Sequence, residues 1–208
     1  DTDTTAPFAT TDSTPTITGT GEVGAIITLK NASGTVLGTG TVDASGNWSI
    51  TPSTALNVGT HTLSLTATDA LGNTSAPTTL SVSILDITPP LTPAITAVGG
   101  DTTAPYATSD TTPTITGTGE AGATITIKDG SGNTIGTGTV SAGGTWSSTT
   151  SPALTEGVHT LDITATDVAG NTSPSNSVSI TILDITAPLA PTVTAVDTDT
   201  TAPFSTTD

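Results

Sequence analysis

Apolar and polar residues alternate with a period of two along several short stretches of the chain. The clearest stretch is HTLSLTATD at residues 61–69, and residues 25–30 and 123–129 alternate in the same way. This period places successive side chains on opposite faces of a β-strand. Turn sequences such as Asp43-Ala-Ser-Gly-Asn47 separate the stretches, and none has a helical period. The pattern predicts an all-β chain of short strands joined by turns.

The whole pattern recurs at a fixed spacing. Pro7, Pro105 and Pro203 are successively 98 residues apart, and so are Trp48 and Trp146. A period of this length is the size of an independent domain rather than of a short solenoid repeat. The predicted units are residues 1–86, which lack a first strand, residues 87–184, which are complete, and residues 185–208, which contain the linker, first strand and following loop of a third unit.

About seven short strands per unit, without helices, are typical of an antiparallel β-sandwich of the immunoglobulin-like kind. We therefore predict tandem immunoglobulin-like antiparallel β-sandwich domains. Cysteine is absent, so the disulfide that often joins the two sheets is absent too. Trp48 and Trp146 are expected to fill the space between the sheets.

The charge of the chain limits its partners. The formal net charge is −16, and Lys30 and Lys128 are the only basic residues apart from two histidines. Nucleic acid is excluded as a partner because no basic patch is available to contact phosphates. Anionic membranes are disfavoured for the same reason, and no apolar run is long enough for membrane insertion. We expect any targeting or anchoring segment to lie outside this sequence.

Acidic residues recur in register between the repeats. Twelve of the 18 acidic residues have an acidic counterpart one period away. A surface that only needs to be soluble does not require such a register, although a recent duplication would also preserve it. These residues are Asp3, Asp101 and Asp199; Asp12, Asp110 and Asp208; Glu22 and Glu120; Asp69 and Asp167; and Asp86 and Asp184.

The expected topology brings several of these carboxylates to one seam. If residues 91–98 are the first strand, the loop DTTAPYATSD that follows it shares a pole with the end of the last strand. The loops GTGEAG and DVAGN then lie at the opposite pole. Converging carboxylates repel one another, and Ca²⁺, which accepts six to eight oxygen ligands, relieves that repulsion. The residues predicted to meet at the first junction are Asp3, Asp12, Asp86, Glu120 and Asp167.

A second interpretation of these acids stays open. Aspartates often cap turns by accepting hydrogen bonds from nearby backbone N–H groups. For Asp69 and Asp167 the motif D-x-x-G-N is as typical of a simple turn as of a calcium site.

Other motifs do not indicate catalysis or further cofactors. Residues 19–24 and 117–122 match G-x-G-x-x-G, but an alternating strand follows where a nucleotide site needs a helix. His61 and His159 occur once per unit without a second histidine or cysteine, so zinc is not expected. Paired acids without an aromatic platform do not indicate glycoside hydrolysis. We expect no enzyme.

Four sequence markers carry a resemblance to a known family. They are GTGE-x-G at residues 19–24, the GNW hairpin at 46–48, HTL-x-x-TATD-x-x-GN at 61–73, and D-x-T-x-P at 86–90. Together they resemble the bacterial immunoglobulin-like repeats of Bap-type giant biofilm adhesins and RTX-type surface adhesins. The second copy departs at its hairpin, where SAGGTW replaces DASGNW. The resemblance implies an extracellular stalk on a Gram-negative cell surface, stiffened by calcium at its junctions with linker aspartates as ligands.

The expected function is therefore structural: a spacer that supports cell adhesion and biofilm formation. The alternative is that the repeats themselves bind a glycan, a host receptor or like repeats on another cell. Nearly uniform loops and few aromatic residues favour the spacer. One more expectation concerns residues 191–196 (PTVTAV), a first strand without its own domain. If the ends of the chain are free, neighbouring copies could pair this strand head to tail with the first unit, which lacks one.

Overall fold

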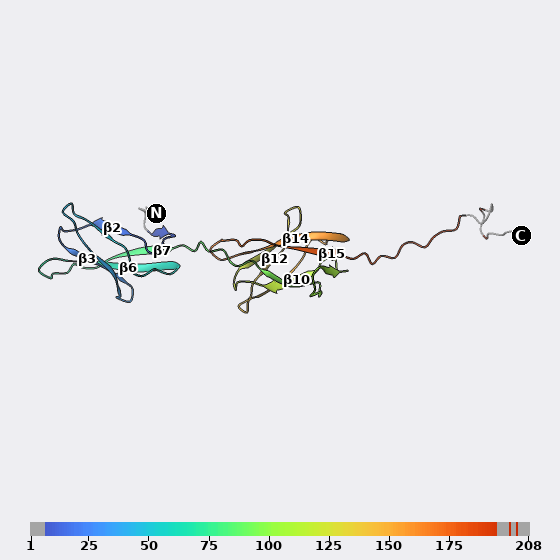
Figure 1. The fold of residues 1–208 in the computed structure, drawn as a ribbon, viewed down its shortest axis with the longest axis horizontal. Coiled ribbons are helices and arrows are strands. Elements are labelled where there is room, and N and C mark those ends of the chain that lie inside the picture. Colours follow the sequence, from blue (N-terminus) through green and yellow to red (C-terminus); the bar gives the residue numbers. More distant parts are fainter. Residues whose placement is uncertain (1–6, 195–199, 201–202, 204–208) are drawn as a thin grey trace.

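The computed structural model describes residues 7–194, Thr200 and Pro203. Within this part of the chain every regular element is a β-strand. The strands form two units that follow one another along the long axis, and residues 185–194 extend from the second unit without a strand (Figure 1).

The second unit is a sandwich of two sheets. One sheet has three strands in the order β13-β10-β8, and the other has five in the order β12-β11-β14-β15-β9. All neighbours are antiparallel except β9, which runs parallel to β15. The strands are β8 (Ala94–Val98), β9 (Tyr106–Thr108), β10 (Thr114–Thr118), β11 (Thr124–Lys128), β12 (Thr134–Thr139), β13 (Thr145–Thr149), β14 (Gly157–Thr166) and β15 (Asn176–Ile182).

Alternation along these strands builds the core. Inward positions carry branched apolar residues, and Ile115, Ile127 and Leu161 are fully buried between the sheets. Trp146 is buried among them, and its indole N–H donates to the Thr118 carbonyl at 3.2 Å. The prediction that this tryptophan fills the inter-sheet space is confirmed. The all-β, immunoglobulin-like fold class is confirmed as well.

The described residues of the first unit repeat this plan, and no strand among them corresponds to β8. The larger sheet has the order β1-β7-β6-β3-β4, and the described strands of the smaller sheet are β2 and β5. Trp48 occupies the position of Trp146 but is only half-buried. The strands are β1 (Phe8–Thr10), β2 (Ile17–Thr20), β3 (Ile26–Asn31), β4 (Val36–Thr41), β5 (Asn47–Ile50), β6 (Gly59–Thr68) and β7 (Thr78–Ile84).

One local expectation is wrong. The stretch DTTAPYATSD is not simply a loop, because β9 lies inside it and pairs with β15 in the other sheet. Tyr106 is buried there, so the stretch contributes to the core. β1 does the same against β7 in the first unit. Three residues are too few to show a period, which is why alternation did not reveal these strands.

Candidate functional site

At the junction between the units, two side chains of the second unit donate hydrogen bonds to backbone carbonyls of the linker. Asn171, in the loop between β14 and β15, donates its side-chain N–H to the Asp86 carbonyl at 3.2 Å. Asn176, at the start of β15, donates to the Pro93 carbonyl at 2.9 Å. The two bonds fasten the linker near both of its ends, on the pole that faces the first unit.

The second linker provides an internal control, because its sequence is closely similar. Pro90 and Pro93 are buried in the first linker, whereas their counterparts Pro188 and Pro191 are exposed. The described residues place no unit after the second linker, so the burial comes from contact with the second unit rather than from the linker itself. Proline fixes φ near −65°, so a proline-rich segment whose backbone is hydrogen-bonded to the second unit has few ways to bend.

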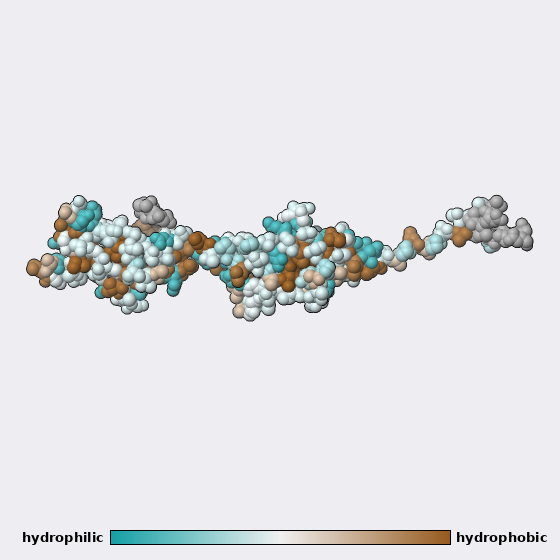
Figure 2. Space-filling model, in the orientation of Figure 1, coloured by the Kyte–Doolittle hydropathy of each residue, from teal (hydrophilic) through white to brown (hydrophobic). Residues whose placement is uncertain are grey.

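Apolar side chains remain exposed along both linkers. Leu91 is 83% exposed and Leu189 is 96% exposed. Brown surface is visible at the narrow waist between the units and along the C-terminal segment (Figure 2). The linker contact therefore depends on its prolines and backbone carbonyls rather than on its leucines.

Asp167 holds the loop that carries Asn171. Its Oδ1 accepts the Asn171 backbone N–H at 2.8 Å, and its Oδ2 accepts the Asn171 side-chain N–H at 2.9 Å. The side-chain bond from Asn171 is the main cause that lowers the pKa of Asp167, with backbone bonds adding to it against desolvation. One amide thus bridges a carboxylate of the second unit and a carbonyl of the linker.

The same turn occurs in the first unit. Asp69 accepts the Asn73 backbone N–H at 2.8 Å and its side-chain N–H at 2.7 Å. The side-chain bond from Asn73 again comes first among the causes that lower the pKa of Asp69. Gly72 and Gly170 adopt positive φ in these turns, where L side chains are strained. D-x-x-G-N is therefore a capped turn in both units.

The other repeated aspartates that are described also cap turns. In each pair below, Oδ1 of the aspartate accepts the backbone N–H two residues later, at 2.7–2.9 Å. Their second carboxylate oxygens accept no hydrogen bond from described residues. The pairs are Asp12 with Thr14, Asp86 with Thr88, Asp110 with Thr112, and Asp184 with Thr186. Turns that repeat in both units are thus one sufficient reason for the register of the acids.

Asp101 has a different structural role. Its Oδ1 accepts the Thr103 N–H at 3.0 Å and its Oδ2 accepts the Ala107 N–H at 2.9 Å. These backbone bonds, with the Thr103 bond the largest cause, lower the pKa of Asp101. The carboxylate pins the loop through which the chain crosses from β8 to β9. Its counterparts Asp3 and Asp199 lie outside the described residues, as does Asp208.

The predicted poles are correct, but a full carboxylate cluster is not found. Asn171 joins the Asp167 carboxylate to the backbone carbonyl of Asp86, and the Asp86 carboxylate takes no part in this contact. Glu22 and Glu120 engage neighbouring turns only through their backbone carbonyls. Across residues 7–194, with 200 and 203, no group of three or more acidic, histidine or cysteine side chains is arranged to hold a metal. These residues alone do not supply the six to eight oxygens of calcium, so calcium stays a prediction.

Sequence reasoning missed the two asparagines that fasten the linker. Asn171 is repeated as Asn73, so the duplication contained a signal for it. Asn176 corresponds to Thr78 and gave none.

Comparison with known families decides the identity of the two units. A model described as a bacterial Ig domain matches residues 4–83 and residues 101–184. The chain belongs to the bacterial Ig domain family. Both matches leave out the linker and β8, so the first strand of the second bacterial Ig domain lies in the segment between the two matched regions.

Solved structures with similar folds include bacterial and animal proteins. A biofilm-associated protein BSP domain is 24% identical with a TM-score of 0.35; the match covers 86% of this chain, which spans 29% of that one. Fibronectin(III)-like modules of Clostridium thermocellum CbhA are 20% identical, with a TM-score of 0.35 and coverage of 84% and 87%. An amphioxus IgVJ-C2 molecule is 17% identical, with a TM-score of 0.38 and coverage of 83% and 99%.

A comparison with curated proteins found no match. Among the residues that the structure describes, no helix is long and apolar enough to cross a membrane.

Proposed function

We propose that this chain is an extracellular spacer segment of a bacterial surface adhesin, on a Gram-negative cell. Its tandem bacterial Ig domains hold a distal adhesive part away from the cell and thereby support adhesion and biofilm formation. The observation that carries the proposal is that the second domain holds the linker by hydrogen bonds and by burial of its prolines. Asn171 and Asn176 bond to its backbone, and Pro90 and Pro93 are buried against the second domain.

The physical argument for a spacer concerns bending. Two domains joined by a free linker sample many relative orientations, so their end-to-end distance fluctuates. A linker tied at both ends loses that freedom, and stiffness then accumulates over successive repeats. The period of 98 residues and the net charge of −16 both fit a solvated array that does not collapse on itself.

Calcium is the second part of the proposal. Its support is the register of the acids and the position of Asp86, whose second carboxylate oxygen accepts no bond from described residues at the junction. Extracellular calcium modules bind at roughly 0.1–1 mM, so such a site would fill outside the cell. Bound calcium would add to the grip of the two asparagines rather than replace it.

Small-angle scattering of the chain in chelator, calcium and magnesium tests both parts. The spacer proposal predicts an extended profile with a fixed maximum dimension in calcium. If calcium reinforces the junction, chelation reduces this dimension, and calcium but not magnesium restores it. A profile that is extended and does not respond to calcium supports the linker held by the two asparagines and rejects calcium at the junction. A flexible profile in every buffer contradicts the spacer.

A further inference from the structure

The second bacterial Ig domain is connected to the rest of the chain through its first and its last strand. The linker leads directly into β8, and residues 183–194 leave directly from β15. A pull along the chain therefore enters the domain at β8 and leaves it at β15. The two connections emerge at opposite ends of the domain, and β14 and β15 follow the long axis, so the pull acts along the strands (Figure 1).

The load passes through one pair of parallel strands. After β8 the chain crosses to the other sheet as β9, which runs parallel to β15 with Tyr106 opposite Ile180 and Thr108 opposite Ile182. The pull draws β9 toward the linker and β15 the opposite way, so the two strands are loaded along their length, in shear. The evenly spaced hydrogen bonds of a parallel pair then share the load, whereas bonds that are opened from one end break one at a time.

The pair is closed by a further hydrogen bond and anchored in the core. The Leu183 N–H, directly after β15, donates to the Thr108 carbonyl at 2.8 Å. Tyr106, Ile180 and Ile182 are all buried and belong to the same core cluster. Sliding β9 along β15 therefore requires the hydrogen bonds to break while a buried aromatic side chain leaves the core.

Asp101 connects β8 to this pair with little slack. Its carboxylate accepts the Thr103 N–H at 3.0 Å, which tightens the crossing loop, and the Ala107 N–H at 2.9 Å, which ties the loop to β9 itself. Tension that detaches β8 from β10 is thus passed on to β9 and is not taken up by a loose loop.

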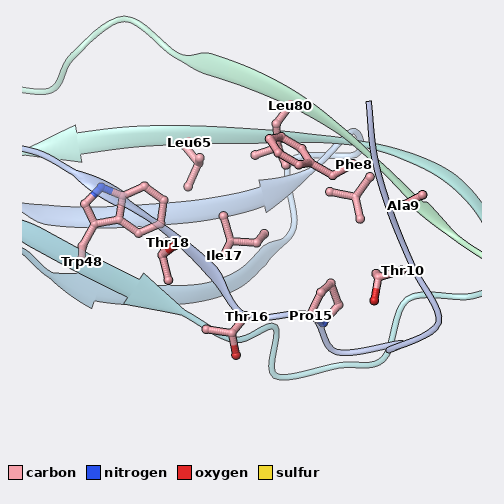
Figure 3. A pocket seen from close by; sticks show the side chains of 11 residues that line it. Phe8, Ala9, Thr10, Pro15, Thr16, Ile17, Thr18, Trp48, Leu65 and Leu80 are labelled. Atoms are coloured by element: carbon pink, nitrogen blue, oxygen red, sulfur yellow. The ribbon is translucent and has the colours of Figure 1, made fainter. Parts of the chain in front are cut away.

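The first domain contains the same parallel pair. β1 runs parallel to β7, and the Leu85 N–H donates to the Thr10 carbonyl at 2.8 Å. Phe8 stands at the position of Tyr106 and points into the space that Leu80 also lines (Figure 3). The pair, its closing bond and its aromatic residue therefore belong to the repeat and not to one domain alone.

We propose that the parallel pair of β9 and β15 is a mechanical lock, which keeps the domain folded when the chain is pulled through its linkers. The role rests on the spacer function, because a spacer between a cell and a distant surface is pulled along its length. The lock lies wholly inside the domain, so it needs neither calcium nor a fixed linker. Scattering tests the spacer, and the force at which this domain unfolds tests the lock.

Single-molecule force spectroscopy in two pulling directions tests the lock. Handles on Leu91→Cys and Leu189→Cys load the second domain through both linkers and leave the first domain outside the path; both leucines are exposed, and native cysteine is absent. Handles on Ser109→Cys and Leu189→Cys keep one anchor and move the other to an exposed position directly after β9. This second pull opens β9 and β15 from their common end. The first direction is expected to need a several-fold higher unfolding force.

Variants at the closing bond test its contribution in the first direction. Leu183→Pro removes the N–H that Thr108 accepts and is expected to lower the unfolding force. Leu183→Ala trims the same side chain but keeps the N–H, so it is the matched control and should stay close to the wild-type force. Ile127→Ala opens a cavity beside β11, which the load does not cross. It should reduce stability in urea far more than the unfolding force, since contacts that are still made when the lock breaks do not change that barrier.

Three results overturn the proposal. The first is an equal unfolding force in the two pulling directions, a result that needs no destabilised variant. The second is an equal force for the Leu183→Pro and Leu183→Ala chains. The third is an Ile127→Ala chain whose unfolding force falls as far as that of Leu183→Pro, because force would then follow overall stability and not the strand pair.

Discussion

Within the described residues, the second bacterial Ig domain has a strand, β8, that is not matched in the first, and this strand decides how well its core is closed. Ile115, Ile163 and Ala165 are fully buried in the second domain, where β8 covers the sheet edge. Their counterparts in the first domain are half-buried although the surrounding strands keep the same order. A single edge strand thus closes several core positions at once. This strand follows directly from the linker. The segment between the two domains therefore connects them and also supplies the strand that completes the core of the second domain.

The largest expected effect comes from truncating the same isoleucine in each domain. Ile115→Ala should destabilise the second domain by about 2–5 kcal/mol, since it opens a cavity in a closed core. Ile17→Ala should destabilise the first domain by roughly half as much, because this side chain already contacts solvent. Each domain has one tryptophan, so denaturation of Trp48→Phe chains reports the second domain and of Trp146→Phe chains the first.

Equal losses at the two sites would show that β8 does not close the core. The parent single-tryptophan chains serve as controls. They should also show that the first domain unfolds at lower denaturant than the second.

Alanine at the paired glycines tests the close approach of the strand. Gly117→Ala should cost about 1–3 kcal/mol or more, because its Cβ would strike a backbone carbonyl that cannot rotate away. Gly19→Ala should cost less, since only the Trp48 ring must move. Thermal unfolding followed by the tryptophan of each domain measures both. A larger loss at Gly19 would contradict the close backbone approach of β8 at Gly117.

A smaller effect is expected where the second core carries hydroxyls. Ser148 and Thr150 are buried, and their side-chain oxygens find no partner, whereas the first domain has Ile50 and Pro52 there. Thr150→Val keeps the shape and removes the unpaired hydroxyl, so it should stabilise the second domain by about 1 kcal/mol. Trp146 fluorescence during urea unfolding is the measurement. A destabilised variant would mean that the hydroxyl is satisfied in solution.

The smallest effect concerns pH. Hydrogen bonds from Asn171 and Asn73 lower the pKa of Asp167 and of Asp69 below the ordinary 3.8. A depressed folded pKa gives stability that is present above the unfolded pKa and is lost as pH falls through the folded one. Asn171→Ala should raise the pKa of Asp167 and leave that of Asp69 unchanged, as carboxyl ¹³C shifts would show. No change at Asp167 contradicts the amide bridge.

Alternation of apolar and polar residues was sufficient to predict the long strands, but not the strands of three residues. Residues 61–69 alternate cleanly and form most of β6 (Gly59–Thr68). β9 was missed because three residues after a proline carry no period. The poles followed from strand order, so the approach of the Asp167 loop to the linker could be foreseen, whereas the bond from Asn171 to the Asp86 backbone carbonyl could not.

The roles of the individual acids were harder to predict. An aspartate that caps a turn and one that binds calcium share the same residue type and the same exposed loop. Sequence register therefore could not separate the two, and hydrogen-bond geometry was needed. The hydrogen bond from Asn176 to the Pro93 carbonyl is a single contact, and Thr78 stands at the position of Asn176 in the first domain, so the repeat did not indicate it.

The most direct test of the central claim, that the second domain fixes the linker, is a distance distribution across the junction. Ser33 and Ser131 are equivalent exposed positions, and spin labels on cysteines there span one repeat. Pulsed electron–electron double resonance should give one narrow distance in the wild type and a broad one in the chain with Asn171→Ala and Asn176→Ala. A broad distribution in the wild type, with calcium and without it, would contradict the fixed junction and the spacer function built on it.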